Sequence, residues 1–180
     1  MAAVVLLLRG INLGPNRRVP MAQLRELLQE AGYEGVRTYV QSGNVVVRTG
    51  RSPEEVEREA ERLVAARFGF EVPVVARTRE ELAAVVERNP LGDVASEPKR
   101  YQVSFLSDEL DAATADRVRE LAVEPERVAV HGREIYAWHP EGVARSKLWN
   151  GLAGKGLGVT ATARNWSTVT TLLEMASEEE

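Results

Sequence analysis

The chain has 180 residues, of which 44% are hydrophobic and 28% are charged, with a net charge of −4 and no cysteine. This length predicts a globular protein of one domain or two small halves. The absence of cysteine excludes disulfides, a thiolate nucleophile and iron–sulfur clusters. The first apolar run, "AAVVLLL" at residues 2–8, is too short for a membrane helix and lacks the features of a signal peptide. Residues 3–9 are therefore predicted to form a buried strand, in a cytoplasmic protein with no membrane contact.

The first half of the chain follows the order strand, helix, strand, strand, helix, strand, which is the ferredoxin-like or split βαβ pattern. Ser52 and Pro53 have the residue types of an N-cap and a first helical residue, and Gly32 and Gly69 are predicted to end the two helices. The strands are predicted at 3–9, 36–40, 44–48 and 71–78, and the helices at 21–32 and 52–69.

The second half follows a connection rich in turn residues, "RNPLGDVASEPK". It is predicted to hold a strand at 100–107, a helix at 108–122, a hairpin at 127–140 that turns at Gly132, and two terminal helices at 143–156 and 165–179. We therefore predict an α+β fold of two ferredoxin-like halves related by topological duplication, residues 1–89 and 90–180.

Two residue types are candidates for special chemistry in the second half. His131 and His139 would lie at opposite ends of the hairpin, roughly 20 Å apart at ~3.3 Å per strand residue, so no metal site and no cofactor is predicted.

Four aromatic residues suggest either an RNA-stacking platform or a core, and the alternation with polar residues along the strand favours the core. They are Tyr101, Phe105, Tyr136 and Trp138.

The stretch "RGINLGPNRR" follows the first predicted strand, and "QSGN" separates the second from the third. In a split βαβ sheet the first two strands are parallel, so both segments are predicted to lie at the same end of the sheet. The structural interpretation is that the glycines permit tight turns and that Asn12 and Asn44 cap backbone groups. The functional interpretation is a ligand-binding loop.

The segments "RGINLG", "YVQSGNVVV", "RSKL" and "TARNWSTVTTL" resemble those of the DUF1697 family, a bacterial group named as a domain of unknown function. The resemblance extends over nearly the whole chain. It implies two α+β halves and no particular chemistry.

Acidic residues are distributed unevenly along the chain. Residues 1–25, 35–53 and 142–173 together hold eleven basic and no acidic side chains. These ranges coincide with the motifs just named, so we predict a positive site for a small anion such as a nucleotide or a phosphorylated metabolite. The predicted ligand-binding residues are Arg9, Gly10, Asn12, Arg17, Arg18, Ser42, Gly43, Asn44, Ser146, Lys147, Arg164 and Asn165.

Two other functions fit the sequence. The first is an enzyme that acts on a phosphorylated or carboxylated small molecule through the hydroxyl of Ser42 or Ser146. Because no histidine or acid lies in these motifs, Lys147 is the nearest candidate base. No catalytic residue is identified. The second is a structural or protein-interaction domain, which predicts buried, fully hydrogen-bonded motif residues. A pI of about 5.4 argues against duplex DNA.

Overall fold

The computed structural model of the protein describes residues 1–153 and 155–178. Its contacts form two compact units: Met1–Ala84 with Thr171–Glu180, called unit 1, and Val85–Thr170, called unit 2. The chain therefore leaves unit 1 within helix α3 (Arg79–Arg88) and returns to it within helix α6 (Trp166–Ser177). The division into halves at residues 89 and 90 stays a prediction.

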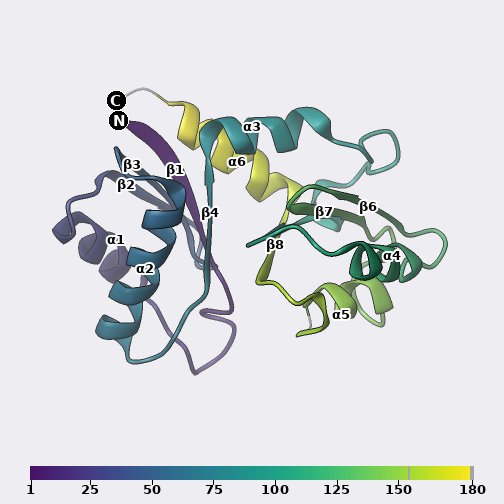
Figure 1. Ribbon diagram of the computed structural model, residues 1–180, viewed down its shortest axis with the longest axis horizontal. Coiled ribbons are helices and arrows are strands. Elements are labelled where there is room, and N and C mark those ends of the chain that lie inside the picture. Colours follow the sequence, from purple (N-terminus) through teal and green to yellow (C-terminus); the bar gives the residue numbers. More distant parts are fainter. Residues whose placement is uncertain (154, 179–180) are drawn as a thin grey trace. The chain divides into compact units, whose positions relative to one another are not determined.

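Unit 1 contains a four-stranded antiparallel sheet in the order β2-β3-β1-β4 (Figure 1). The α+β class is confirmed, and the order strand, helix, strand, strand, helix, strand over the first 78 residues is the one predicted. The elements are β1 (Ala2–Leu8), α1 (Met21–Glu30), β2 (Glu34–Tyr39), β3 (Asn44–Thr49), α2 (Pro53–Phe68), β4 (Val74–Thr78) and the start of α3 (Arg79–Arg88).

Helix α2 begins and ends where its sequence predicts. The Ser52 hydroxyl accepts a hydrogen bond of 3.2 Å from the Glu55 N–H, and Gly69 ends the helix in the left-handed conformation at φ 82°. Because these local signals fix both ends, the apolar stripe of the helix, Val56, Ala60 and Val64, faces the sheet and is buried.

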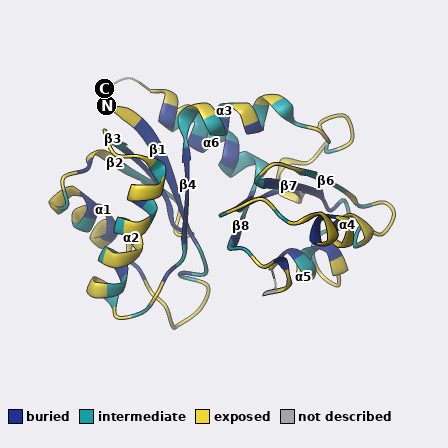
Figure 2. Cartoon of the chain, viewed as in Figure 1, coloured by how far each residue is buried: buried dark blue, intermediate teal, exposed yellow. Residues whose placement is uncertain are grey.

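The core of unit 1 lies between α1, α2 and one face of the sheet. Residues of the opposite face, such as Val5, Leu7 and Val46, are also buried (Figure 2). This agrees with the continuous rather than alternating apolar sequence of β1 and β3, which is typical of strands covered on both faces.

Unit 2 repeats the arrangement with a second antiparallel sheet in the order β6-β7-β5-β8. Gly132, at φ 55°, forms the predicted hairpin turn between β6 and β7. The elements are η1 (Pro98–Arg100), β5 (Tyr101–Leu106), α4 (Ala112–Glu120), β6 (Arg127–His131), β7 (Glu134–Trp138), α5 (Lys147–Ala153), η2 (Lys155–Leu157), β8 (Ala161–Asn165) and α6 (Trp166–Ser177).

The aromatic residues of this sheet form core, as the alternation predicts. Tyr101, Phe105, Tyr136 and Trp138 are all buried, and Trp166 stacks on Tyr101 with ring centroids 4.7 Å apart. An RNA-stacking platform on these rings is therefore wrong, because a base could not reach them.

Four elements were not predicted: strand β8, helix α3 and the two short helices η1 and η2. Strand β8 carries the weak strand sequence "ATARN" and owes its position to pairing with β5, a contact distant in sequence. Helix α3 begins with a capping box: the Thr78 hydroxyl accepts from the Glu81 N–H, and the Glu81 carboxylate accepts from the Thr78 N–H, each at 3.0 Å. The Thr-x-x-Glu spacing is a sequence signature of a helix start and could have predicted α3.

Helix α5 is shorter than the predicted helix at 143–156. Ser146 caps it, so it begins at Lys147, and residue 154 lies outside the described residues. Across residues 1–153 and 155–178, none of the helices combines the length and the apolar character needed to cross a bilayer.

Candidate functional site

The Asn12 side chain ties the loop after β1 to the turn between β2 and β3. Its amide nitrogen donates to the Val19 and Gln41 carbonyls at 2.9 and 2.7 Å, and its oxygen accepts from the Val19 N–H at 2.9 Å. The loop 9–20 and the turn 40–43, called here the loop pair, thus lie at one end of the sheet. The sequence prediction that they are neighbours is confirmed.

Backbone hydrogen bonds and the buried Asn44 also stabilise the loop pair. The Leu8 N–H donates to the Gly43 carbonyl at 2.9 Å, and β1 pairs Leu7 with Asn44. Asn44 is fully buried, and its amide donates to the Tyr39 carbonyl and the Ser42 hydroxyl, each at 3.0 Å. Asn44 therefore acts as a turn-stabilising residue.

The two consecutive arginines of the loop differ in their surroundings. Arg17 Nε donates to the Gly10 carbonyl and Nη2 to the Glu71 carbonyl, at 3.1 and 2.7 Å, while the guanidinium lies 5.1 Å from the centroid of the Phe70 ring. These contacts fasten the loop to the segment before β4, so Arg17 has a structural role here.

Arg18 instead lines a hollow of about 340 Å³ together with Asn12, Pro20 and Gln41. Within the described part of the chain its side chain makes one hydrogen bond, of 3.4 Å from Nη1 to the Gly14 carbonyl. That length is beyond the usual range for N–H···O bonds, so most of the donor capacity of Arg18 faces the hollow and solvent.

Three non-glycine residues of the loop pair have a left-handed backbone conformation, and Val40 is the most strained of them. Val40 has a φ of 52°, a conformation that is costly for a β-branched residue, and the residue is 52% exposed. Asn12 and Arg17, at φ 56° and 57°, share this left-handed conformation. Strained conformations of this kind persist only where the surrounding contacts impose them, which the Asn12 hydrogen bonds do.

The remaining predicted site residues belong to unit 2. Lys147 is exposed at the first position of α5, and Asn165 caps α6 by accepting from the Thr168 N–H at 2.9 Å. Arg164 is buried in β8, where it donates to the Thr162 hydroxyl at 2.7 Å and the Ala163 carbonyl at 2.9 Å. Burial lowers the pKa of Arg164 to about 10.

Ser146 lies in a cluster that the sequence motifs did not reveal. Glu126 Oε2 accepts from the Ser146 hydroxyl at 2.6 Å and lies 2.9 Å from Nδ1 of His139, which is fully buried. The prediction that Lys147 is the nearest candidate base to Ser146 is therefore wrong. Glu126 comes from the loop before β6, so the acid-free ranges could not point to it. We call Glu126, His139 and Ser146 the polar cluster.

The polar cluster does not have the geometry of a catalytic triad. In a triad the hydroxyl and the carboxylate bind different nitrogens of the imidazole. Here both lie on the Nδ1 side, and the hydroxyl of Ser146 also accepts from the Trp149 N–H at 3.0 Å. The cluster thus anchors the start of α5.

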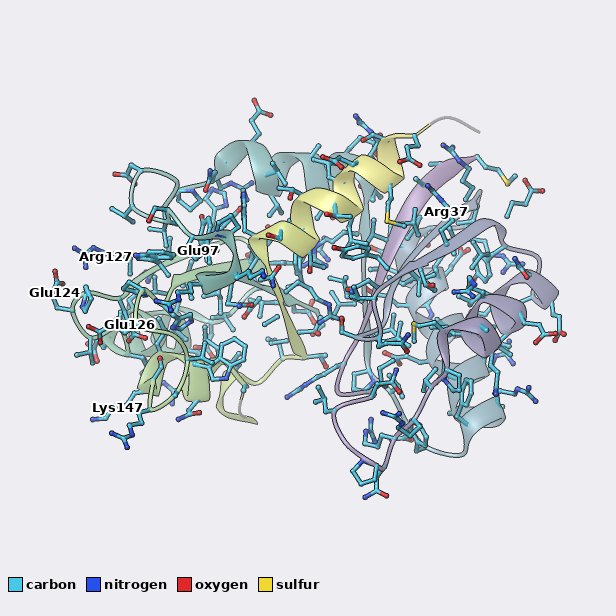
Figure 3. The ribbon with its side chains drawn as sticks, turned by 180° about the vertical axis from the view of Figure 1, so that it is seen from behind. Arg37, Glu97, Glu124, Glu126, Arg127 and Lys147 are labelled. Atoms are coloured by element: carbon cyan, nitrogen blue, oxygen red, sulfur yellow. The ribbon has the colours of Figure 1, made fainter. Side chains whose placement is uncertain are left out.

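A hollow of about 450 Å³ lies beside the polar cluster, lined by Glu126 and Ser146 and by Glu124, Arg145 and Lys147, among others. Figure 3 places Glu124, Glu126, Arg127 and Lys147 at one end of unit 2. The lining mixes carboxylates with cations, so it does not have the uniform positive charge that the sequence predicts for the site.

The stability of unit 2 is expected to fall in acid through Glu126. Partial burial alone would raise the pKa of this carboxyl group, but hydrogen bonds from Ser146, His139 and the Val123 N–H outweigh it and place the pKa below its usual 4.5. A lowered carboxyl pKa contributes stability above the unfolded pKa, and this contribution is lost as the pH falls through the folded one. Urea unfolding followed by tryptophan fluorescence between pH 6 and pH 3 should show this loss in the wild type, and a smaller loss in Glu126→Gln.

Histidines and carboxylates do not form a metal site among the described residues, in which no three such groups come together suitably. His131 pairs with Glu134 beside the hairpin turn, whereas His139 follows Trp138, which pairs with Arg127 at the other end. The predicted separation of the two histidines along the hairpin is confirmed.

Comparison with known proteins extends the description of the fold. The conserved bacterial protein SP0830 from Streptococcus pneumoniae has a similar structure, with a TM-score of 0.80 and 24% sequence identity over 97% of this chain and 98% of that one. At this identity the similarity concerns the fold alone. A search of curated proteins finds no match. A family model described as "Protein of unknown function (DUF1697)" matches residues 1–136, and the chain therefore belongs to the DUF1697 family.

Proposed function

We propose that the protein binds a small anionic ligand, such as a nucleotide or a phosphorylated metabolite, at the loop pair of unit 1. The proposal rests on the contrast between the two arginines. Arg17 donates two hydrogen bonds to backbone carbonyls of the protein. Arg18 lines a hollow of about 340 Å³, and within the described residues its side chain makes a single, long hydrogen bond. A guanidinium in this position offers several donors in the fork geometry that suits phosphate and carboxylate.

The framework of the hollow supports the proposal. The Asn12 amide fixes both walls through its bonds to Val19 and Gln41, so little conformational freedom is lost when a ligand binds. The sequence on both sides, residues 1–25 and 35–53, contains no acidic residue that would repel an anion. Five other predicted residues of unit 1 contribute to the site by shaping the loop pair: Arg9, Gly10, Ser42, Gly43 and Asn44. The predicted residues of unit 2, Ser146, Lys147, Arg164 and Asn165, are not part of this proposal.

Arg18→Ala is expected to weaken binding of inorganic pyrophosphate at least about tenfold, because hydrogen bonds to charged groups contribute roughly 1.5 to 3 kcal/mol. Isothermal titration calorimetry at low salt measures the affinity. The matched control is Arg62→Ala on α2, whose side chain is 68% exposed and 4.0 Å from its partner Glu59. Equal affinities of the two variants would contradict the proposal.

A structural or protein-interaction domain is the second candidate. It is favoured by Asn44, which is buried and hydrogen-bonded as that hypothesis requires, and by the burial of Arg164. An enzymatic function has less support, because the Ser146 hydroxyl donates to a carboxylate whose lowered pKa makes it a weak base. The calorimetric titration separates binding from a purely structural role.

A further inference from the structure

One face of the unit 1 sheet carries two arginines on neighbouring strands, Arg37 on β2 and Arg48 on β3. Val36 and Val47, the residues beside them in sequence, belong to the core under α1 and α2. Successive side chains of a strand point to opposite faces, so both arginines project from the other face. The register pairs Arg37 with Val46, two positions from Arg48, which places the two arginines close together.

Both arginines bind the end of α6. The Arg37 guanidinium forms an ion pair with the Glu178 carboxylate through Nη1 and donates to the Met175 carbonyl through Nη2. Arg48 Nη2 donates to the Glu178 carbonyl at 2.6 Å. Figure 3 labels Arg37 within unit 1.

We propose that Arg37 and Arg48 form a binding site for an acidic peptide segment, which Glu178 occupies in cis and for which an acidic segment of a partner protein competes. The occupant seen in the structure defines the ligand chemistry. It presents one carboxylate and two main-chain carbonyls, those of Met175 and Glu178, to the two guanidiniums.

This set of acceptors favours a peptide over a free anion. The last carbonyls of a helix lack intrahelical partners and carry partial negative charge, so they attract cations. A second helix end followed by glutamate would offer the same carbonyls and the same carboxylate. Inorganic phosphate would offer charge without the spacing of the three groups.

The contact with Glu178 is suited to exchange. The Arg37 side chain is 38% exposed and that of Glu178 is 60% exposed, and ion pairs in such surroundings are weak and screened by salt. The rest of α6 is held independently by the buried Leu172 and Ala176. Release of Glu178 would therefore vacate Arg37 Nη1 and Arg48 Nη2, while the helix and its Met175 carbonyl stay in place.

This site shares no residue with the hollow lined by Arg18, so the two proposals can fail separately. A peptide must compete with a tethered occupant whose effective concentration lies in the millimolar range. Weakening the occupant should therefore reveal the site. The variant is Glu178→Gln combined with the same substitution at the two glutamates that follow in the sequence.

The test measures binding of a fluorescein-labelled hexaglutamate peptide to the full chain by fluorescence anisotropy at low salt. We expect the triple glutamine variant to bind about threefold or more tightly than the wild type, since the tethered competitor is lost. Adding Arg37→Ala and Arg48→Ala to it should lower the affinity at least about tenfold, whereas adding Arg62→Ala should change it little. Circular dichroism confirms that each variant is folded.

Three results would overturn the proposal. They are equal peptide affinity of the triple variant and the wild type, equal effects of the Arg37/Arg48 and Arg62 substitutions, and displacement of the peptide by inorganic phosphate at the same concentration as by unlabelled peptide. Each can occur whether or not pyrophosphate binds at Arg18.

Discussion

Gly43→Ala is expected to destabilise unit 1 by about 2 to 5 kcal/mol, because the new methyl group would be both strained and overpacked. Gly43 has a φ of 87°, which side chains with a Cβ rarely adopt. A Cβ built there would lie 2.8 Å from Leu8 Cβ and 2.9 Å from Ile11 Cδ1. Leu8 and Ile11 are buried, so they have little room to move away.

Hydrogen exchange of the β1 and β3 amides should report this change, because all three tryptophans, Trp138, Trp149 and Trp166, belong to unit 2. Gly50→Ala is the control: it follows β3 directly, a Cβ there meets nothing within 4 Å, and its φ is not positive. Comparable protection in both variants would show that the loop pair does not depend on close packing at Gly43.

Glu126→Ala is expected to destabilise unit 2 by about 2 to 4 kcal/mol, because it leaves buried hydrogen-bonding groups without their acceptor. The carboxylate accepts from the Ser146 hydroxyl and the Val123 N–H, and it lies against Nδ1 of the fully buried His139. Water could replace it near Val123 but not readily at His139. The start of α5 would lose its anchor.

Urea unfolding monitored by tryptophan fluorescence measures this effect directly, since Trp149 lies beside His139 with ring centroids 5.8 Å apart. Glu124→Ala provides the comparison, because this nearby glutamate is 80% exposed and paired with Arg127. Its loss should change the free energy of unfolding by no more than about 1 kcal/mol. If both alanines had the same effect, the polar cluster would not stabilise unit 2.

The sequence predicted the arrangement of the loop pair because that arrangement follows from topology. Because β1 and β2 both pair antiparallel with β3, they are parallel to each other, so the loop after one strand and the turn after the other share an end of the sheet. The pairing of Leu7 with Asn44 confirms this. The buried β1 was equally readable, since its apolar residues are continuous.

The different roles of Arg17 and Arg18 could not be predicted. The two residues are adjacent and chemically identical, and only the contacts of Arg17 with Phe70 and Glu71, 54 positions away for Glu71, distinguish them. The polar cluster escaped prediction for a related reason. Segments chosen because they contain no acidic residue exclude Glu126 by definition, although Glu126 contacts Ser146 in the structure.

Strand β8 shows a third limit. Its sequence has few of the β-branched and aromatic residues typical of strands, and its conformation is imposed by β5, whose Val103 pairs with Arg164. Local propensity therefore gave no indication of this strand, although the duplicated topology of unit 1 leaves a place for it beside β5.

Unit 1 is formed by two segments that are far apart in the sequence, and this affects the order in which the chain folds. The contacts of Arg37 with the end of α6 connect residues 138 and 141 positions apart, and the Arg48 contact spans 130. Contacts that close loops of this size form slowly compared with hairpins and helices, because the entropy of the intervening chain must be overcome first. If residues 85–170 fold first, less conformational entropy is lost when the two segments of unit 1 come together. We therefore expect the sheet of residues 1–84 to form before the helix end binds Arg37 and Arg48.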